Sequence, residues 1–368
     1  MPAERYRRPT LDDIAEAAGV SRTTVSNAYN RPDQLSADLR AEVLRTAKRV
    51  GYAGPNPVAR SLARRRSGAV AVLLDTNLSD AFSDPALSLT LDAFATVLAP
   101  DGHAMVLLPG RSGEAVADGD GNGGPDAEQT RGVQADLAIG CSLADEASAL
   151  GIVRDRRLPL VTIDGPKRRG ALLVGTDDRA GAAAAARHLV ELGHRRIGIL
   201  ANRGATGTPG GRADLDLAAR SPYRVDRERA AGYLDVLTAA GIPPADVPLQ
   251  EASGTSRIDA AADAEALLSA EPQLTGLLCM SDELALGAVH AAQRLGRSVP
   301  RDLSIVGYDD TPAARFTEPA LTTVRQDLAA KGRLAGELAL RRLAGTRTAQ
   351  PATLGVELVV RGSTGPAG

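Results

Sequence analysis

The stretch Thr10-Leu-Asp-Asp-Ile-Ala-Glu-Ala-Ala-Gly-Val-Ser-Arg-Thr-Thr-Val-Ser-Asn-Ala-Tyr29 decides the fold of the N-terminal part of the chain. Thr10 is followed three residues later by an aspartate, a spacing typical of a helix-capping box, and this predicts a helix over 11–18. Gly19 then predicts a tight turn, after which Ser21 is placed to cap a second helix. Two short helices joined by a glycine-containing turn indicate a helix-turn-helix.

The second helix is predicted to run from Arg22 to about Tyr29 and to have two unlike faces. At 100° per residue, Val25 and Ala28 turn toward the first helix, and a third helix over 37–50 closes the small bundle. The opposite face carries the polar side chains Arg22, Thr23, Ser26 and Asn27. Such a face is suited to the edges of DNA bases, although an ordinary helical hairpin is the alternative for the pattern taken alone.

The charge of the chain is divided unevenly. The whole chain has a formal charge of −2, but residues 1–66 hold 13 basic and 7 acidic residues, which leaves −8 on the remainder. A basic segment attached to an acidic body indicates a polyanion-binding module joined to a different kind of domain. Cys141 and Cys279 lie in apolar runs and His is scarce, so we expect no metal site, no disulfide and no cofactor.

The body alternates short apolar runs with longer alanine-rich segments from residue 68 to residue 362. Near-continuous apolar strands, each followed by a helix, favour parallel sheets in βαβ units, and about 290 residues of this pattern favour two α/β lobes. Two segments rich in Gly, 111–131 and 203–223, are expected to be surface excursions or disordered loops. The first contains a formal G-x-G-x-x-G at 119–124, which follows a loop and not a strand, so dinucleotide binding is not expected there.

The N-terminus has no apolar stretch behind its charges, and no run reaches the roughly 20 apolar residues of a membrane-spanning helix. We therefore expect a cytoplasmic protein with no membrane partner. No nucleophile elbow or phosphate loop is present, so an enzyme is not expected. The remaining alternative to a DNA-binding protein is a cytoplasmic solute-binding protein without a DNA role.

Several motifs resemble the LacI/GalR family of bacterial transcription regulators. In the head and hinge they are Thr10-Leu-Asp-Asp-Ile-Ala15, Ala18-Gly-Val-Ser-Arg-Thr-Thr-Val-Ser26 and Pro55-Asn-Pro-Val-Ala-Arg-Ser-Leu-Ala63. In the body they are Gly175-Thr-Asp-Asp-Arg-Ala-Gly181, Leu192-Gly-His-Arg-Arg-Ile197, Arg229-Ala-Ala-Gly-Tyr233, Ser281-Asp-Glu-Leu-Ala-Leu-Gly287, Val306-Gly-Tyr-Asp-Asp310 and Leu321-Thr-Thr-Val-Arg-Gln-Asp327. The resemblance implies an all-α helix-turn-helix head and an α/β, periplasmic-binding-protein-like body of two parallel-sheet lobes.

The resemblance also implies which residues touch DNA. Arg22, Thr23 and Asn27 match the positions that read bases in the major groove, and Arg and Asn are suited to guanine and adenine respectively. Ala59 and Leu62 match the hinge-helix residues that enter the minor groove. The positions that contact the DNA backbone are matched by Thr10, Ser21, Thr24, Ser26 and Asn30.

In the body, Asp164, Arg229, Asp282 and Asp309 fall where the family places effector ligands or the polar groups beside them. Structural ion pairs across the cleft are the alternative. Gly140 and Ser253 replace a polar ligand and a stacking aromatic of relatives, which weakens the case for a sugar. The expected function is a transcriptional repressor, a homodimer on double-stranded operator DNA, whose affinity is controlled by a sugar or related metabolite.

The resemblance divides the chain into four parts. The DNA-binding head is expected at 1–54 and the hinge helix with its linker at 55–67. The N-terminal lobe is expected at 68–175 with 326–352, and the C-terminal lobe at 176–325 with 353–368.

Overall fold

The computed structural model describes residues 9–52, 54, 66–110, 124–204, 210–214, 218, 220–254, 256–346 and 350–368. It separates into two compact units, Met1–Ser67 and Gly68–Gly368. The helical part of the first unit, residues 9–52, is called the head here, and the second unit is called the body. The expected hinge residues Ala59 and Leu62 and the G-x-G-x-x-G segment up to residue 123 lie outside the described residues.

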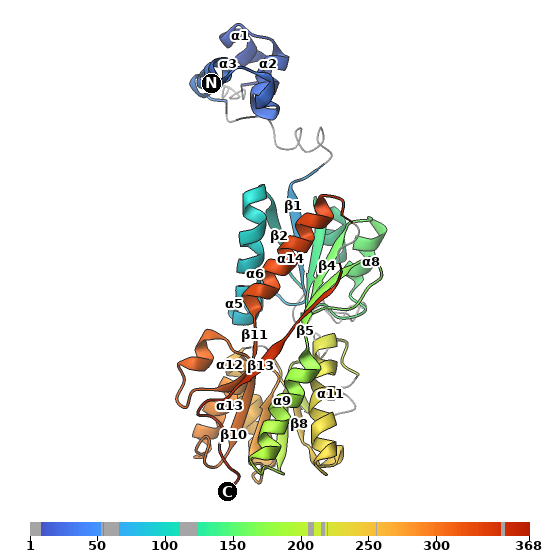
Figure 1. Ribbon diagram of the computed structural model, residues 1–368, viewed down its shortest axis with the longest axis vertical. Coiled ribbons are helices and arrows are strands. Elements are labelled where there is room, and N and C mark those ends of the chain that lie inside the picture. The colour runs from blue at the N-terminus through green and yellow to red at the C-terminus, as the bar shows by residue number, and fades with distance from the viewer. Residues whose placement is uncertain are drawn as a thin grey trace, which may run out of the picture. The chain divides into compact units, whose positions relative to one another are not determined.

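The head is a bundle of short helices, drawn in blue in Figure 1. It contains α1 (Leu11–Ala18), α2 (Arg22–Asn30), the 3₁₀ turn η1 (Pro32–Gln34) and α3 (Ala37–Val50), so the three predicted helices are confirmed within one residue at each end. Thr10 and Asp13 form the expected capping box at the start of α1, and Gly19 ends that helix in the left-handed conformation, with φ 63°. The core consists of Ile14, Ala15, Val25, Ala28, Val43 and Ala47.

The first sheet of the body is parallel throughout, in the order β12-β5-β4-β3-β1-β2. Its strands are β1 (Ala69–Leu74), β2 (Ala104–Leu108), β3 (Leu137–Cys141), β4 (Leu160–Ile163), β5 (Leu172–Thr176) and β12 (Ala352–Leu354). The associated helices are α5 (Leu78–Ser83), α6 (Pro85–Leu98), η2 (Ala99–Asp101), α7 (Ala127–Gly132), α8 (Ser148–Asp155) and α14 (Leu328–Leu343). Helices α6 and α14 pack against each other beside this sheet (Figure 1).

The second sheet has the order β13-β11-β10-β9-β6-β8-β7. It is parallel except at its two edges, where β13 and β7 run antiparallel to their neighbours. Its strands are β6 (Ile197–Ala201), β7 (Gly211–Ala213), β8 (Leu249–Glu251), β9 (Gly276–Cys279), β10 (Ser304–Asp309), β11 (Thr322–Gln326) and β13 (Val356–Val359). Helices α9 (Asp178–Glu191) and α11 (Arg224–Ala239) pack together, as do α12 (Arg257–Ala270) and α13 (Asp282–Arg294), with the short turns η4 (Pro244–Asp246) and η5 (Pro312–Arg315).

The two sheets make two lobes, and the chain passes between them at Asp177, Asp327 and Gly355. Each crossing follows directly after the last residue of β5, β11 or β12. Because the ends of these strands meet where the lobes join, polar side chains that follow the strands are brought to one place.

Parts of the two glycine-rich segments form regular structure. The first segment leads into α7, and the second contributes β7 to the edge of the second sheet, where Arg212 pairs with Gln250. Ala218 and Ser221 are also buried in the body. The expectation of surface loops therefore needs correction for these parts, because an edge strand needs only one neighbour for its hydrogen bonds and little apolar content.

Candidate functional sites in the head and the body

Helix α2 presents a continuous polar face to solvent. Ser21 caps the helix by accepting a hydrogen bond from the Thr24 amide at 3.0 Å, which satisfies one of the amides left free at a helix start. Arg22 and Thr23 are exposed, whereas Val25 and Ala28 on the other side are buried against α1 and α3. The face is therefore available for a partner because the packing of the bundle is completed from the opposite side.

The side chains expected to read bases have only weak contacts in the head. The Arg22 guanidinium lies 3.6 Å from Asp12, and both side chains are about two-thirds exposed, so the pair costs little to break. The Asn27 amide donates to Gln34 at 3.3 Å. Arg22, Thr23 and Asn27 thus lie on one accessible face of α2, and their base contacts remain a prediction.

The residues expected to contact the DNA backbone surround that face. Ser21 and Thr24 share a hydrogen bond at 2.9 Å, and Asn30 donates to Ser26 at 3.4 Å. Thr10 lies at the start of α1, where both its amide and its hydroxyl donate to Asp13. These hydroxyls and amides border the polar face of α2. This position is compatible with contacts to DNA phosphates, which would set the register of the head on the duplex.

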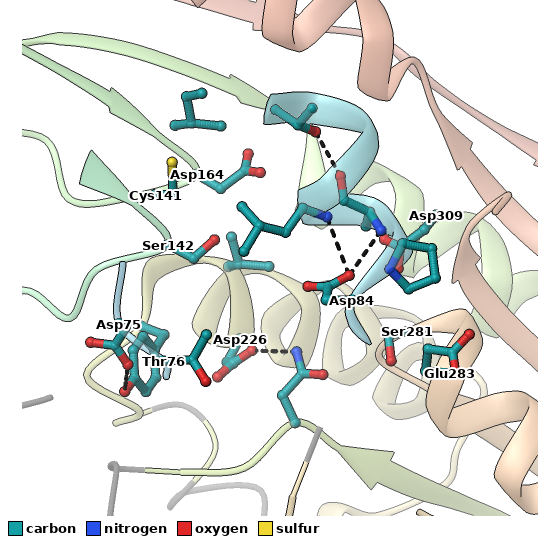
Figure 2. A pocket seen from close by; sticks show the side chains of 18 of the residues that line it. Asp75, Thr76, Asp84, Cys141, Ser142, Asp164, Asp226, Ser281, Glu283 and Asp309 are labelled. Carbon is teal, nitrogen blue, oxygen red and sulfur yellow. Dashed lines mark hydrogen bonds between the residues drawn. The ribbon is translucent and has the colours of Figure 1, made fainter. Parts of the chain in front are cut away.

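The body contains a cavity of about 240 Å³ between its two lobes. Figure 2 shows Cys141, Ser142 and Asp164 on one wall, from strands of the first sheet, and Ser281, Glu283 and Asp309 on the facing side. We call it the interlobe cavity. Three of the sequence-predicted effector residues, Asp164, Arg229 and Asp309, line it.

Three residues of the cavity lining have an unusual backbone. Ser142, Asp164 and Asp309 have φ values of 47°, 54° and 119°, in a region that side-chain-bearing residues rarely adopt. Each stands at or just after the end of a strand, β3, β4 or β10. Such conformations cost on the order of 1–3 kcal/mol each and gather at functional sites, so they favour a ligand role for this cavity.

Arg229 contacts several residues of the second lobe at the cavity. Its Nε donates to Asp178 at 3.0 Å, its Nη2 lies 3.9 Å from Asp309, and its Nη1 donates to the Met280 carbonyl. The guanidinium carbon lies 3.6 Å from the centre of the Tyr308 ring. Burial raises the pKa of Asp309, and the positive charge of Arg229 opposes that shift.

On the first lobe, Asp164 is paired with a lysine that sequence analysis did not single out. Lys331 on α14 is 1% exposed, and its Nζ lies 2.5 Å from Asp164 Oδ2. The same Nζ donates to Gln326 Oε1, while Gln326 Nε2 donates to Asp309 Oδ1 at 2.6 Å. A chain of polar contacts therefore runs from one lobe to the other through Gln326, at the crossing between β11 and α14.

The structure places Asp282 behind the cavity lining, between the lining residues Ser281 and Glu283. Asp282 is fully buried and is not part of the cavity lining. Its two oxygens accept hydrogen bonds from the Thr311 amide at 2.7 Å and the Thr323 hydroxyl at 2.5 Å. Burial raises its pKa to about 7, although those two donors favour the charged form. This carboxyl joins α13 to β11 and the turn after β10.

Other acidic groups complete the lining. Asp226 accepts from Asn202 at 2.8 Å, and burial raises the pKa of Asp226. Burial also raises the pKa of Asp84, which caps α6 and receives hydrogen bonds from two backbone amides. Tyr223 donates its hydroxyl to Asp75 and brings an aromatic ring to the cavity, a role for which sequence reasoning had no signal.

The two sequence departures noted at Gly140 and Ser253 do not fall on the cavity. Gly140 lies within β3 and is not a lining residue, and Ser253 donates its hydroxyl to Asp263 at 2.9 Å. Among the described lining residues, the aromatic side chain is that of Tyr223, which precedes the first residue of α11.

Comparison with known proteins decides the family. Residues 10–56 match the family described as "Bacterial regulatory proteins, lacI family", and residues 186–364 match the "Periplasmic binding protein-like domain". The chain is 39% identical to HTH-type transcriptional regulator Rv3575c of Mycobacterium tuberculosis, over 91% of each chain. The chain belongs to the LacI family. It is thus a DNA-binding transcriptional regulator with an effector-binding body, and a solute-binding protein without a DNA role is not favoured.

Solved structures of LacI-family proteins share the whole architecture. The lac repressor dimer bound to operator and the anti-inducer ONPF is 26% identical, with a TM-score of 0.77 over 98% of this chain and 100% of that one. The transcriptional regulator CelR in complex with cellobiose is 28% identical, with a TM-score of 0.66 over 97% and 100%. Both support the fold expected for this LacI-family chain, an α-helical head followed by an α/β body.

Two further properties concern only the part of the chain that the structure describes. None of its helices has both the length and the apolar character needed to span a bilayer. Within the same residues, no group of three or more His, Cys, Asp or Glu side chains is arranged to hold a metal ion.

Proposed function

We propose that this LacI-family regulator is a repressor whose operator affinity changes when an uncharged, hydroxyl-rich molecule occupies the interlobe cavity. The observation that carries the proposal is that buried carboxylates and buried cations lie side by side in the cavity lining. Asp164 is matched by Lys331, and Asp309 by Arg229. Asp75, Asp84, Asp226 and Glu283 also line the cavity, so its carboxylates outnumber its cations and disfavour an anionic ligand. Hydroxyl groups can both donate to the carboxylates and accept from the cations.

The size and lining of the cavity support a sugar-sized ligand. A volume of about 240 Å³ is close to the lower end for small-molecule sites, and the Tyr223 ring provides an apolar surface beside several oxygen acceptors. CelR, a relative of similar architecture, is described in complex with cellobiose. We assign ligand contact to Asp164, Arg229 and Asp309 and a structural role to Asp282.

For the DNA side, we propose that Arg22, Thr23 and Asn27 read bases, and that Ala59 and Leu62 of the hinge enter the minor groove. Backbone contacts are assigned to Thr10, Ser21, Thr24, Ser26 and Asn30. One head offers few base contacts, so we propose a homodimer that binds a two-fold symmetric operator in the cytoplasm. The lac repressor relative is itself described as a dimer bound to operator.

We also propose the four-part division of the chain into a head at 1–54, a hinge at 55–67, and lobes at 68–175 with 326–352 and at 176–325 with 353–368. The passage of the chain between sheets at Asp177, Asp327 and Gly355 supports these limits. A non-enzymatic role follows from the same proposal, since the cavity lining serves binding and the relatives are named as regulators.

The test begins with selection of duplexes from a random DNA library by the full chain. A palindromic consensus is expected, because two heads related by two-fold symmetry read the same sequence on opposite strands. The affinity for that duplex is then measured with and without D-glucose, D-ribose and cellobiose at fixed salt, since phosphate contacts make affinity depend on salt.

A change in operator affinity by at least one neutral sugar is the expected result. Two results contradict the proposal. Selection that yields no sequence preference would remove the operator assignment, and a response confined to sugar acids or amino sugars would remove the assignment of an uncharged effector.

A further inference from the structure

We infer that Lys331 sets the charge selectivity of the interlobe cavity. Because it forms an ion pair with Asp164, the part of the cavity beside Asp164 accepts a hydroxyl group and rejects an ammonium group. This inference rests on the proposed function, because it concerns the ligand of the same cavity. It adds a residue and a selection rule that neither the motifs nor the relatives' names contain.

The position of Lys331 is unusual for a lysine. It lies in the apolar stripe of α14, with Leu328, Ala335 and Leu338 at helical spacing, and all four side chains are buried. A lysine in such a stripe is rarely retained without a charged partner. Here the partner is Asp164, which lines the cavity and whose other oxygen, Oδ1, is buried without a hydrogen-bond partner among the described residues.

The hydrogen-bonding capacity of the ammonium is not used up by its protein partners. Lys331 Nζ has three hydrogens, and Asp164 Oδ2 and Gln326 Oε1 take two of them. No third acceptor is bonded to Nζ among the described residues, and Lys331 is part of the cavity lining. Lys331 thus has one unused donor, and Asp164 beside it has one unused acceptor, Oδ1.

A hydroxyl group matches this pair because it accepts from Lys331 and donates to Asp164 at the same time. An ammonium group placed beside this pair finds the Asp164 charge already neutralised and meets the Lys331 charge, so it gains no ion pair with Asp164 and is repelled by Lys331. Gln326 holds Lys331 in this position. Its Oε1 accepts from Lys331 Nζ, and its Nε2 donates to Asp309 Oδ1 at 2.6 Å. Lys331 therefore cannot turn away from Asp164 without breaking a contact that reaches the second lobe.

The experiment uses the full chain and a matched set of probes: D-glucose, its 2-amino, 3-amino and 6-amino derivatives, and D-glucuronate. Dissociation constants are measured by calorimetry for the wild type and for Lys331→Met, which has a similar length and no charge. In Lys331→Met, at least one amino derivative is expected to gain roughly tenfold or more in affinity relative to glucose, the scale of a single charge-assisted hydrogen bond. Lys331→Arg, which keeps the charge, should leave this ratio near that of the wild type.

Three further variants separate charge selection from loss of structure. Lys167→Met removes an exposed lysine outside the cavity and should leave the ratio unchanged. The double variant Lys331→Met with Asp164→Asn has no unpaired charge and should also show no gain for amines. Asp164→Asn alone leaves the Lys331 ammonium without its carboxylate partner, so the affinity for glucuronate should rise roughly tenfold relative to that for glucose. This variant tests the inference if Lys331→Met does not fold.

The inference is overturned if Lys331→Met folds and its amine-to-glucose ratio equals that of the wild type, or if the double variant shifts as far as the single one. It is likewise overturned if Lys331→Met does not fold and Asp164→Asn shows no gain for glucuronate. Failure of the proposed function is a separate outcome: the selectivity would shift as described while no neutral sugar changes the operator affinity of the wild type.

Discussion

The head and the interlobe cavity use polar side chains in opposite ways. In the head, the residues assigned to DNA come from one short segment, 10–30, and Arg22 and Thr23 are exposed to solvent. In the body, the cavity residues come from strands and helices far apart in the sequence, and Arg229, Asp309 and Lys331 are almost completely buried. A surface for a large polyanion can therefore be formed by one short segment of the chain. A site for a small molecule requires side chains that surround the ligand, and these come from distant parts of the sequence.

The sharpest test of this division is removal of residues 1–67. The head has its own core, formed around Ile14, Val25 and Val43, and the body has separate cores in its two lobes. Removal should abolish operator binding and leave sugar binding by the body within about twofold, a change of roughly 0.4 kcal/mol. The measurements are anisotropy with operator DNA and calorimetry with sugar. Operator binding by the truncated body would show that the two functions are not divided in this way.

The next largest effect is expected in the cavity. Asp309→Ala removes the acceptor that Gln326 and Arg229 share, so the operator response to effector should be lost while basal operator binding remains. Operator titrations with and without sugar measure it. Asp235→Ala is the matched control, because that aspartate is half-exposed and pairs with Arg179 on the outside of α9 and α11. A full response in folded Asp309→Ala would make this side chain structural.

A smaller effect is expected in the head. Arg22→Ala should cost about 1–3 kcal/mol per half-site and relax specificity at one base pair, because a bidentate contact to a base edge is lost. Arg45→Ala removes the same charge from an exposed position of α3 and should weaken all DNA sequences alike. Competition titrations with operator and random duplexes distinguish the two. Equal losses on both DNAs for Arg22→Ala would contradict base reading.

The smallest effect is a pH dependence that separates the buried acids of the body from exposed ones. Burial raises the pKa of Asp282 to about 7, so the folded state holds this proton more tightly than the unfolded state. The protonated Asp282 carboxyl therefore contributes its full stabilisation below about pH 4, and this stabilisation is lost as the pH rises through about 7. The melting temperature should fall by a few degrees over that range.

Asp282→Asn should flatten this fall in melting temperature. Asp302→Asn should not change it above pH 5, because Arg301 holds the pKa of the exposed Asp302 at about 2. If the slope survives in folded Asp282→Asn, other acids of the cavity carry it.

Sequence reasoning was most successful where structure is set by neighbours along the chain. The predicted helices of the head are confirmed, and the predicted alternation of strands and helices in the body is found as two mostly parallel sheets. The segment Thr-Thr-Val-Arg-Gln, which forms β11, has no apolar run that would indicate a strand. Its position between β10 and β13 buries it all the same, which is a property of the sheet and not of the segment.

The cavity shows the same limit for single residues. Asp164, Arg229 and Asp309 line it as expected, but Asp282 is turned toward Thr311 and Thr323, although it directly follows a lining residue, Ser281. Lys331 could have been noticed as a charged residue within the apolar stripe of a helix. Its partner, however, is 167 residues away along the chain, and no local pattern indicates that distance.

The sequence by itself determined the head, its polar recognition face and the alternation of strands and helices in the body, because helix caps and hydrophobic periodicity act over a few residues. Only the tertiary structure decided which carboxylates face the cavity and which cations neutralise them. The physical reason is that the energy of a buried charge depends on its surroundings on every side, and these are assembled only when β5, β11 and β12 bring the two lobes together.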